Sequence, residues 1–444
     1  MPETPVSVPM PARGMHRRLW AMAGPIILSN VSVPVLGAVD TAVMGHLPEP
    51  YYIGAVALGT MIFNFIYHGF NCLRMGTTGP TAQARGAGHY AEVRALALRA
   101  MLLAAALGGA VIVLQGPIIA FAFWAIEASP EVQELGTRYF LIRVWGMPAV
   151  LGAYAIIGWQ YGIGDARRPL VLQLVMNAVN IGLDLLFVFA LGWDVGGVAA
   201  AGLIASYLGL FLGLYYVRRA FGELPAGTDR ARVLDPARMR RMLTMNLDIF
   251  LRTMCVVSTG AIFMAKSAAL GDVPLAANQV LFNFLFITSF GLDGIAHAAE
   301  AILGDTAGRR ERDAFQRGAR AVLAWAGLVA LLNVALYAVV GPAIIDLMTT
   351  IPEVRSAAFA YLAWAVLMPL VSAWAYTFDG IFLAATRTRP MRNSMVTAFI
   401  SFLAALYVLV PFLGNHGLWA AMAVFLGVRG VTLYFRYPAL LRSL

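Results

Sequence analysis

The sequence predicts an all-α polytopic membrane protein with twelve transmembrane helices, arranged as two related six-helix bundles. Of the 444 residues, 60% are hydrophobic and only 12% are charged, whereas soluble domains contain about 25% charged residues. Apolar runs of the length needed to cross a bilayer, about 20 residues, recur along the chain. The few charges are concentrated between these runs, which indicates a chain that folds within a membrane.

Each apolar run is expected to form a helix. Backbone polar groups need partners inside the membrane, and the ten-residue alternation of a β-barrel is absent. In order along the chain, we expect helices at residues 19–46, 52–78, 93–115, 135–159, 169–191, 195–217, 243–270, 274–303, 314–341, 355–384, 391–413 and 417–435. The polar segment 220–242 follows the sixth helix. We therefore expect it to be a cytoplasmic linker between an N-lobe (1–219) and a C-lobe (243–444).

The net charge of +9 is interpreted as a sign of membrane topology and not of nucleic-acid binding. Lys266 is the only lysine, and the arginines cluster at both ends and after helices two, four, six, eight and ten. The other connections carry acids such as Asp194, Asp272 and Glu353. Because positively charged loops remain in the cytoplasm, we expect a multi-pass protein of the inner (cytoplasmic) membrane with both termini in the cytoplasm.

The two halves of the sequence resemble each other at a shift of about 220 residues. Phe70 falls on Phe290, and the segment 83–88 falls on 303–308. Six helices per half make the two repeats parallel, and parallel repeats in transporters hold substrate at their interface and rock to give alternating access. The sequence therefore favours a transporter over a bundle that was merely enlarged by duplication.

An acidic residue, Asp40, lies near the end of the first expected helix. An ionisable side chain in a membrane segment is costly, and it usually faces a protein interior or a water-filled path. Pro25 and Pro34 interrupt the same helix, and proline removes a backbone hydrogen bond and allows a bend. A helix that can bend and carries a titratable group is what a proton- or cation-driven transporter requires, so we expect these prolines to form a hinge.

The fifth expected helix carries a polar stripe. Its members are spaced i, i+4, i+7 and i+11 and share one helix face; they are Gln173, Asn177, Asn180 and Asp184. Helices one and five run in the same direction, so Asp40 and Asp184 belong in the outer half of the membrane and could face one cavity. Gln173 and three residues of helix two, Asn64, His68 and Asn71, are expected to line the same space.

These side chains are compatible with two coupling ions. Burial disfavours the charged form of a carboxyl group, so Asp40 and Asp184 could bind a proton on one side of the membrane and release it on the other. The same carboxylates, with the amide oxygens of Asn180 and Asn177, could instead hold sodium. Asparagine also joins membrane helices by hydrogen bonds, which is an equally good explanation of Asn177 alone. We expect no cofactor and no structural metal.

The second half carries its own charged side chains. The expected charge network consists of Asp248, Arg252, Asp293, His297, Glu300 and Asp379. Arg252 is expected at the depth of Asp293 and Asp248 nearer Glu300, and since intramembrane charges usually pair, we expect an Arg252–Asp293 ion pair. A metal site at Asp293, His297 and Glu300 is disfavoured because it has one histidine and a nearby arginine. For Asp379, a helix-end carboxylate is the alternative.

Seven segments resemble the multidrug and toxic compound extrusion (MATE) family, and within it the DinF-type subgroup. They span the whole chain: Val39–Leu47, Gly69–Gly79, Asn180–Phe187, Asp248–Thr253, Leu275–Asn278, Phe290–Ala301 and Asp379–Thr386. The resemblance implies two six-helix bundles that form a V-shaped cleft. It also implies export of amphipathic, often cationic compounds against an inward proton or sodium gradient.

The resemblance further assigns roles to individual residues. Asp40, Asp184 and Asn180 correspond to the coupling site of the N-lobe, where protonation of the first acid accompanies bending of helix one at its proline. Some relatives use acids of helices seven and ten as a cation site. Here Asp248 lies near the start of helix seven and close to Arg252, which favours proton coupling through the N-lobe.

Other functions are less well supported by the sequence. A flippase for lipid-linked substrates, from the same superfamily, would need a cationic cavity, whereas most intramembrane charges here are acids. An integral membrane enzyme would need a catalytic constellation, and neither an HExxH pattern nor a Gly-Lys-Ser/Thr phosphate loop occurs. The expected partners are small amphipathic or cationic compounds and the lipid bilayer, with no nucleic acid, and we expect a monomer.

Overall fold

The computed structural model describes residues 12–44, 50–125 and 129–444, and the regular structure within them is helical. The helices of the first half are α1 (Ala12–Met44), α2 (Pro50–Phe70), α3 (Cys72–Gly86), α4 (Tyr90–Val113), α5 (Gln115–Ala125), α6 (Pro130–Arg143), α7 (Met147–Gly162), α8 (Arg167–Leu185) and α9 (Val195–Glu223). Those that follow are α10 (Arg230–Val233), α11 (Pro236–Ala269), α12 (Asp272–Gly308), α13 (Arg312–Met348), α14 (Pro352–Ala384) and α15 (Thr388–Arg442). The predicted all-α fold is therefore confirmed. The last three residues of the motif 39–47 lie outside the described residues.

The predicted membrane spans are present, with three changes of boundary. Eleven helical segments in the described chain are long and apolar enough to cross a membrane. The last of them, α15, joins two expected spans across a bend at Gly414, whose φ of 53° and ψ of −128° are not helical. The expected helix 52–78 is divided into α2 and α3 at Asn71, and the expected helix 135–159 is divided into α6 and α7 by a 3₁₀ turn before Pro148.

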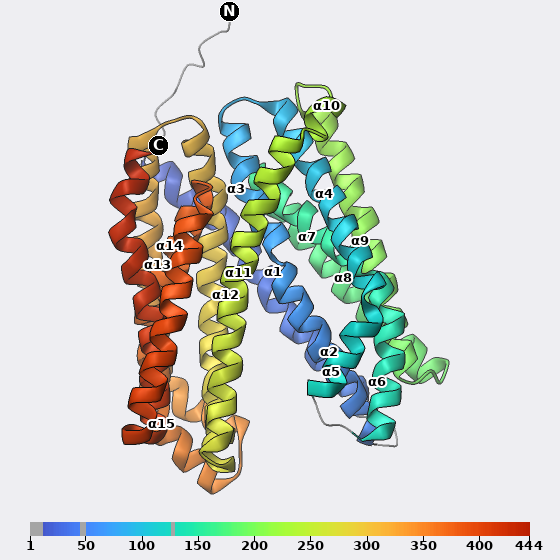
Figure 1. The fold of residues 1–444 in the computed structure, drawn as a ribbon, viewed down its shortest axis with the longest axis vertical. Coiled ribbons are helices and arrows are strands. Elements are labelled where there is room, and N and C mark those ends of the chain that lie inside the picture. Colours follow the sequence, from blue (N-terminus) through green and yellow to red (C-terminus); the bar gives the residue numbers. More distant parts are fainter. Residues whose placement is uncertain (1–11, 45–49, 126–128) are drawn as a thin grey trace, which may run out of the picture.

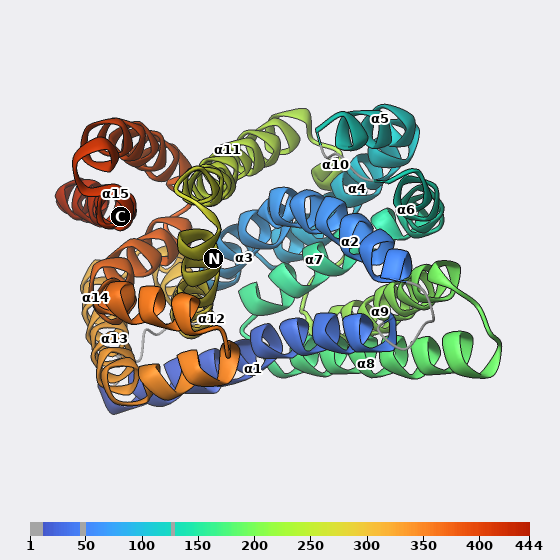
Figure 2. The same cartoon turned by 90° about the horizontal axis from the view of Figure 1, so that it is seen from below.

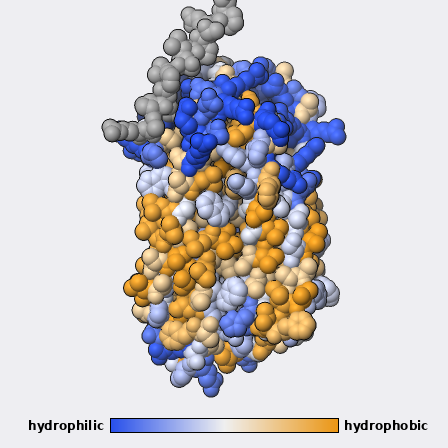
Figure 3. Space-filling model, turned by 90° about the vertical axis from the view of Figure 1, so that its left-hand side faces the viewer, coloured by the Kyte–Doolittle hydropathy of each residue, from blue (hydrophilic) through white to orange (hydrophobic). Residues whose placement is uncertain are grey.

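The helices form two bundles side by side, shown in Figure 1 by blue to green ribbons in one and yellow to red ribbons in the other. We call the end that carries α10 and the turns α3–α4 and α12–α13 the linker face, which is uppermost in Figure 1. Figure 3 shows a broad hydrophobic belt below the strongly hydrophilic linker face. Large apolar side chains such as Phe211, Leu331 and Phe412 are exposed in the structure, as expected for a surface that meets lipid.

Helix α1 crosses from one bundle to the other. Its first half packs into the second bundle, where Leu19 and Ile26 belong to the same buried cluster as Ile295 and Phe315. Its second half follows α8 in the first bundle, and Figure 2 shows the helix running from beside α13 to beside α8. Hydropathy alone does not predict this crossing, because it fixes the length of a membrane helix and not its neighbours.

The two bundles use the same turns at the linker face. Gly88 donates its backbone N–H to the carbonyl oxygen of Arg85 (2.9 Å), and Arg310 donates in the same way to Ala307 (3.0 Å). Equivalent residues of these two turns are 222 positions apart. The predicted alignment of Gly88 with Gly308 is therefore out of register by two residues, and Gly88 is equivalent to Arg310.

These turns place two bulky residues in a conformation that favours glycine. Gly88 and Gly164 of the first bundle have φ of 73° and 84°, whereas the equivalent Arg310 and Thr386 have φ of 59° and 54°. Among the described residues, these two are the non-glycine residues with positive φ. Such a backbone costs a residue with a Cβ atom roughly 1–2 kcal/mol, so their side chains are retained at an energetic cost.

Candidate functional site

The candidate site of the first bundle lies where α1 and α8 end, away from the linker face. Asp40 is one turn from the end of α1, and Asp184 is one residue from the end of α8. The two helices run in the same direction and pack along each other (Figure 2). Their parallel packing brings together two acids that are 144 positions apart in the sequence.

The two carboxyl groups are close enough to share a hydrogen bond. Asp184 is completely buried, and the amide of Asn180 donates to its Oδ2 at 2.5 Å. Each acid also keeps one buried oxygen without a hydrogen-bond partner, Oδ1 in both cases. Two like charges at such close range disfavour the state in which both groups are ionised.

An arginine that the sequence analysis did not single out faces these acids. Arg143, the last residue of α6, lies among Asp40, Tyr67 and Tyr139. Its guanidinium carbon is 5.8 Å from the ring centre of Tyr139, and its Nη1 atom is buried without a partner. One signal in the sequence could have identified Arg143, because an arginine inside a predicted membrane segment is as costly as an acid.

The polar stripe on α8 attaches this helix to α1. Gln173 donates to Oδ1 of Asn177 at 2.9 Å. Asn177 then donates to the backbone carbonyl oxygen of Ser32 at 3.1 Å and to its hydroxyl at 3.0 Å. This contact lies two residues before Pro34, which removes one helical donor. In this structure, the side chain of Asn177 therefore joins the two helices next to the expected hinge.

Of the three helix-two residues, only Asn64 lines the cavity that contains Asp40. This cavity of about 280 Å³ lies between α1 and α2, and its lining includes Asp40, Thr60, Met61 and Asn64. His68 is exposed and contacts the carbonyl oxygen of Asn64 at 2.7 Å. Asn71 lies at the junction between α2 and α3. The expectation that all three would share one space is not met by their positions.

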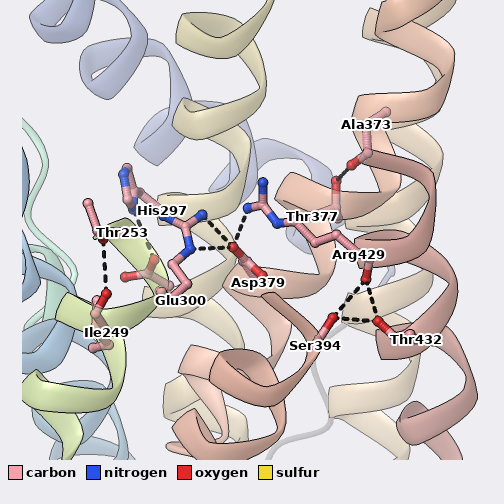
Figure 4. Close-up of polar contacts among 11 residues, drawn as sticks. Ile249, Thr253, His297, Glu300, Ala373, Thr377, Asp379, Ser394, Arg429 and Thr432 are labelled. Atoms are coloured by element: carbon pink, nitrogen blue, oxygen red, sulfur yellow. Dashed lines mark hydrogen bonds and ion pairs between the residues drawn. The ribbon is translucent and has the colours of Figure 1, made fainter. Parts of the chain in front are cut away.

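The second bundle contains a buried charge network in which the pairing differs from the prediction. Arg252 forms its ion pair with Asp379, at 3.0 Å from Nε and 2.5 Å from Nη2, and not with Asp293. Arg429 binds the same carboxylate oxygen from α15, as Figure 4 shows. Asp379 is 3% exposed, so it is a buried, doubly paired acid and not a helix-end carboxylate. Rotation of each helix about its axis decides such pairs, and depth alone does not.

The remaining acids of this network have separate partners. His297 contacts Glu300 at 2.9 Å through Nδ1 (Figure 4), and its Nε2 contacts Arg74 of α3 at 2.8 Å, which joins the two bundles. Asp248 pairs with Arg392 at 2.6 Å and not with Arg252, which binds Asp379.

Asp293 is half-buried and faces His297, Arg252 and Arg74. Within the described residues, no group of three or more His, Cys, Asp or Glu side chains is placed to hold a metal ion.

Comparison with known proteins gives consistent matches over almost the whole chain. A family model described as MatE matches twice, at residues 25–186 and 249–410. DNA damage-inducible protein F of Escherichia coli strain K12 is 39% identical over 417 residues, which cover 94% of this chain and 91% of that protein. A probable multidrug resistance protein NorM of Acinetobacter baylyi is 25% identical over 437 residues, covering 95% of each.

The fold also matches solved structures. A crystal structure described as MATE in the bent conformation superposes with a TM-score of 0.88 at 19% sequence identity, and the match covers 97% of each chain. At this identity the likeness concerns the fold, namely the two bundles and the order of their helices.

Proposed function

The chain belongs to the MATE family of efflux transporters and to its DinF-type subgroup, as its motifs predict, and we propose that it exports amphipathic or cationic compounds in exchange for protons. It is a transporter and not an enzyme. The observation that carries the proposal is the pair of adjacent carboxyl groups in the first bundle, the half-buried Asp40 and the fully buried Asp184.

The acid pair supports proton coupling through its charge balance. With one proton on the pair, Asp40 and Asp184 carry one negative charge, and the nearby guanidinium of Arg143 offsets it. Loss of that proton leaves a second negative charge in a low-dielectric site, where an ionised carboxylate is strongly disfavoured. The deprotonated site is therefore stabilised by admitting water or a cationic compound, and reprotonation expels that compound.

Bending of α1 links this charge change to a change of shape. Pro34 lies between the contact of Asn177 with Ser32 and the acid Asp40. Repulsion between two ionised carboxylates acts on the part of α1 beyond the proline, where the helix lacks a hydrogen bond. We infer that Pro34 is the hinge at which protonation changes the direction of the end of α1, and that Pro25 permits the curvature of the first half.

A sodium site in the second bundle is poorly supported by its charges. Asp379 is bound by Arg252 and Arg429, so two guanidinium groups already occupy the position that a cation would take. In the first bundle, Asp40, Asp184 and Asn180 still offer oxygen ligands for sodium. The coupling ion must therefore be decided by experiment at the first bundle.

The orientation, the substrates and the oligomeric state are further parts of the proposal. By the positive-inside rule, the arginine-rich linker face lies on the cytoplasmic side of the cell membrane. The acid pair then lies in the outer half of the membrane, where it can exchange protons with the exterior. Its negative charge favours cationic compounds, and the exposed apolar side chain of Met61 in the adjoining cavity favours compounds with an apolar part. A single chain supplies all of these residues, so a monomer is sufficient.

Reconstitution in proteoliposomes with independently imposed proton and sodium gradients tests this function. A pH gradient alone should drive export of a fluorescent organic cation, and Asp40→Asn should abolish export because its amide does not take up the coupling proton. Asp165→Asn, at a turn of the linker face where the half-buried Asp165 pairs with Arg168, is the control and should transport like the wild type. Transport that continues in Asp40→Asn, or that stops when potassium replaces sodium at fixed pH, would contradict the proton mechanism.

A further inference from the structure

A second and larger cavity opens at the linker face between the two bundles. Its volume is about 1170 Å³, and its walls come from α3 and α4 of the first bundle and α11 and α12 of the second. It lies at the other end of the molecule from Asp40, and the proposed transport mechanism assigns it no role.

Positive charge predominates in this cavity. Five arginines line it: Arg99, Arg238, Arg241, Arg309 and Arg310. The nearby acids are Glu92 and Glu311 in the lining, Asp305, which binds Arg309 at 3.1 Å, and Asp235, which binds Arg238 at 3.3 Å. Five positive and four negative charges leave an excess of one positive charge before any charge on His89 is counted. A cationic compound is disfavoured here, and an anion is favoured.

The arginines differ in how far they are already neutralised. Arg99 is 2% exposed and pairs with Glu92, which also pairs with Arg238, while the Nε atom of Arg99 is buried without a hydrogen-bond partner. Arg241 and Arg310 are exposed, and neither forms an ion pair within the described part of the chain. The cavity therefore combines a buried, incompletely bonded guanidinium with two unpaired ones.

The backbone at Arg310 is strained, and the shape of the turn does not itself require an arginine there. The equivalent residue of the first bundle is Gly88, for which a positive φ is unstrained, whereas Arg310 has φ of 59°. Thr386, the other strained residue, lines the same cavity, where its hydroxyl accepts a hydrogen bond from Gln83 at 3.4 Å. That hydrogen bond joins α3 to the α14–α15 turn and accounts for a threonine at this strained position. Among the described residues, no such side-chain contact accounts for the arginine at position 310.

We propose that this cavity binds the phosphate group of an anionic ligand, with Arg241 and Arg310 as its principal contacts. Guanidinium groups bind phosphate through paired N–H donors. Basic pockets between membrane helices on the cytoplasmic side bind phospholipid head groups, and soluble phosphate has the same chemistry. Because both bundles form the walls, a bound phosphate holds them together at this face.

Binding to the purified, delipidated protein in detergent tests the proposal. Native mass spectrometry measures binding as phosphatidylglycerol is titrated into the protein. Phosphatidylcholine is the zwitterionic comparison, and inorganic phosphate is the soluble one. Arg241→Gln and Arg310→Gly should each weaken phosphatidylglycerol binding about fivefold, the effect of one charge near an anionic group. The matched controls Arg240→Gln and Arg312→Gln remove exposed neighbours outside the lining and should bind like the wild type.

The outcomes distinguish a lipid head group from a soluble anion, and both of them from general surface charge. Binding of phosphatidylglycerol alone identifies a lipid head group, whereas binding of inorganic phosphate with the same arginine dependence identifies a soluble anion. Equal losses in the control variants, or binding that does not depend on Arg241 and Arg310, would overturn the proposal and indicate general surface charge. Arg310→Gly places at this turn the residue found at Gly88, so loss of folding does not obscure its result.

Bridging between the bundles has a separate readout. The melting temperature should rise when phosphatidylglycerol is added to the wild type, and this rise should be absent in the combined Arg241→Gln and Arg310→Gly variant. A rise that persists in this variant would contradict the bridge. Neither measurement depends on transport, so its result is independent of the proton mechanism.

Discussion

At the scale of single residues, the membrane interior of this protein is organised by a small number of charge contacts. In the first bundle, Arg143 faces the acid pair Asp40 and Asp184. In the second, one acid is held by two arginines, Arg252 and Arg429. Buried charges persist only when they are paired and hydrogen-bonded, so each cluster is sensitive to the loss of one member.

The charge balance of the first cluster gives a prediction about Arg143. Arg143→Gln should lower the melting temperature, because the charge that remains on the acid pair loses its compensating cation. The combined Asp40→Asn and Arg143→Gln variant should recover much of this loss, because it removes one charge of each sign. Thermal unfolding in detergent of the wild type, Asp40→Asn, Arg143→Gln and the combined variant forms a double-mutant cycle. Additive losses in the combined variant would show that Arg143 and Asp40 are not coupled.

The sequence predicted the acids of these two clusters better than their arginine partners. Asp40 and Asp184 could be placed together because the direction of each helix follows from the number of membrane crossings. The partners of Asp379 could not be predicted, because Arg252 and Arg429 lie 127 and 50 positions away and meet it through helix rotation. Hydropathy predicts the depth of a residue in the membrane, whereas the rotation of a helix about its axis is set by packing against neighbouring helices.

At the scale of helices, the close approach of α3 and α12 holds the linker face together. A Cβ atom added at Gly86 would collide with the backbone carbonyl oxygen of Asp305, and one added at Gly308 would collide with that of Gln83. Each glycine thus admits the backbone of the other bundle. Small residues that allow backbones to meet are a frequent basis of helix association in membranes.

Substitution at this crossing should open the linker face. Gly86→Val should displace α3 from α12, because the colliding atom is backbone and cannot rotate away. A cysteine at Thr306, which is 1% exposed, should then react with a maleimide in a background without Cys72 and Cys255. Gly109→Val, where an added Cβ atom meets open space, is the control and should leave the cysteine unreactive. Equal labelling of both variants would show that the crossing does not close this face.

The start of α11 at the linker face depends on a carboxylate cap. The backbone N–H groups of Arg238 and Ala237 donate to Asp235 (3.2 and 2.9 Å), and these bonds lower the pKa of Asp235 below its ordinary value. A lowered pKa in the folded state adds stability above the unfolded pKa, about 3.9, and this contribution is lost as the pH falls through the folded value.

The cap predicts a difference between two substitutions. Asp235→Ala should lower the melting temperature at neutral pH, and the difference from the wild type should shrink as the pH falls below about 4. Asp235→Asn keeps a side-chain oxygen that can accept the same bonds, so it should unfold close to the wild type at neutral pH. An unchanged melting temperature in Asp235→Ala would mean that the cap does not contribute to stability.

At the scale of the whole molecule, the charge pattern predicted the repeated architecture but not the crossing of α1. Alternating arginine-rich and acidic connections indicated twelve crossings, and α15 contains the last two of them. The first half of α1 packs into the second bundle, although its sequence position assigns it to the first. Apolar residues such as Leu19 and Ile26 are equally suited to lipid and to either core, so their composition contains no information about which bundle they join.

The orientation of the molecule in the membrane remains a prediction with a direct test. An impermeant maleimide added to intact cells should label Asp272→Cys and should not label Arg442→Cys, both in a background without the native cysteines. Both positions are exposed in the structure, so access to the reagent depends on the side of the membrane. Labelling of Arg442→Cys in intact cells would place the linker face outside and would reverse the proposed direction of transport.

The crossing of α1 has a thermodynamic consequence for transport. Because its two ends are embedded in different bundles, a change in the angle between the bundles also moves or bends the segment that carries Asp40. If Asp40 carries the coupling proton, a compound that changes this angle alters the affinity of Asp40 for the proton, and the proton alters the affinity for that compound by the same factor. One continuous helix would thus make drug and proton each other's effector even when they never meet in the same pocket.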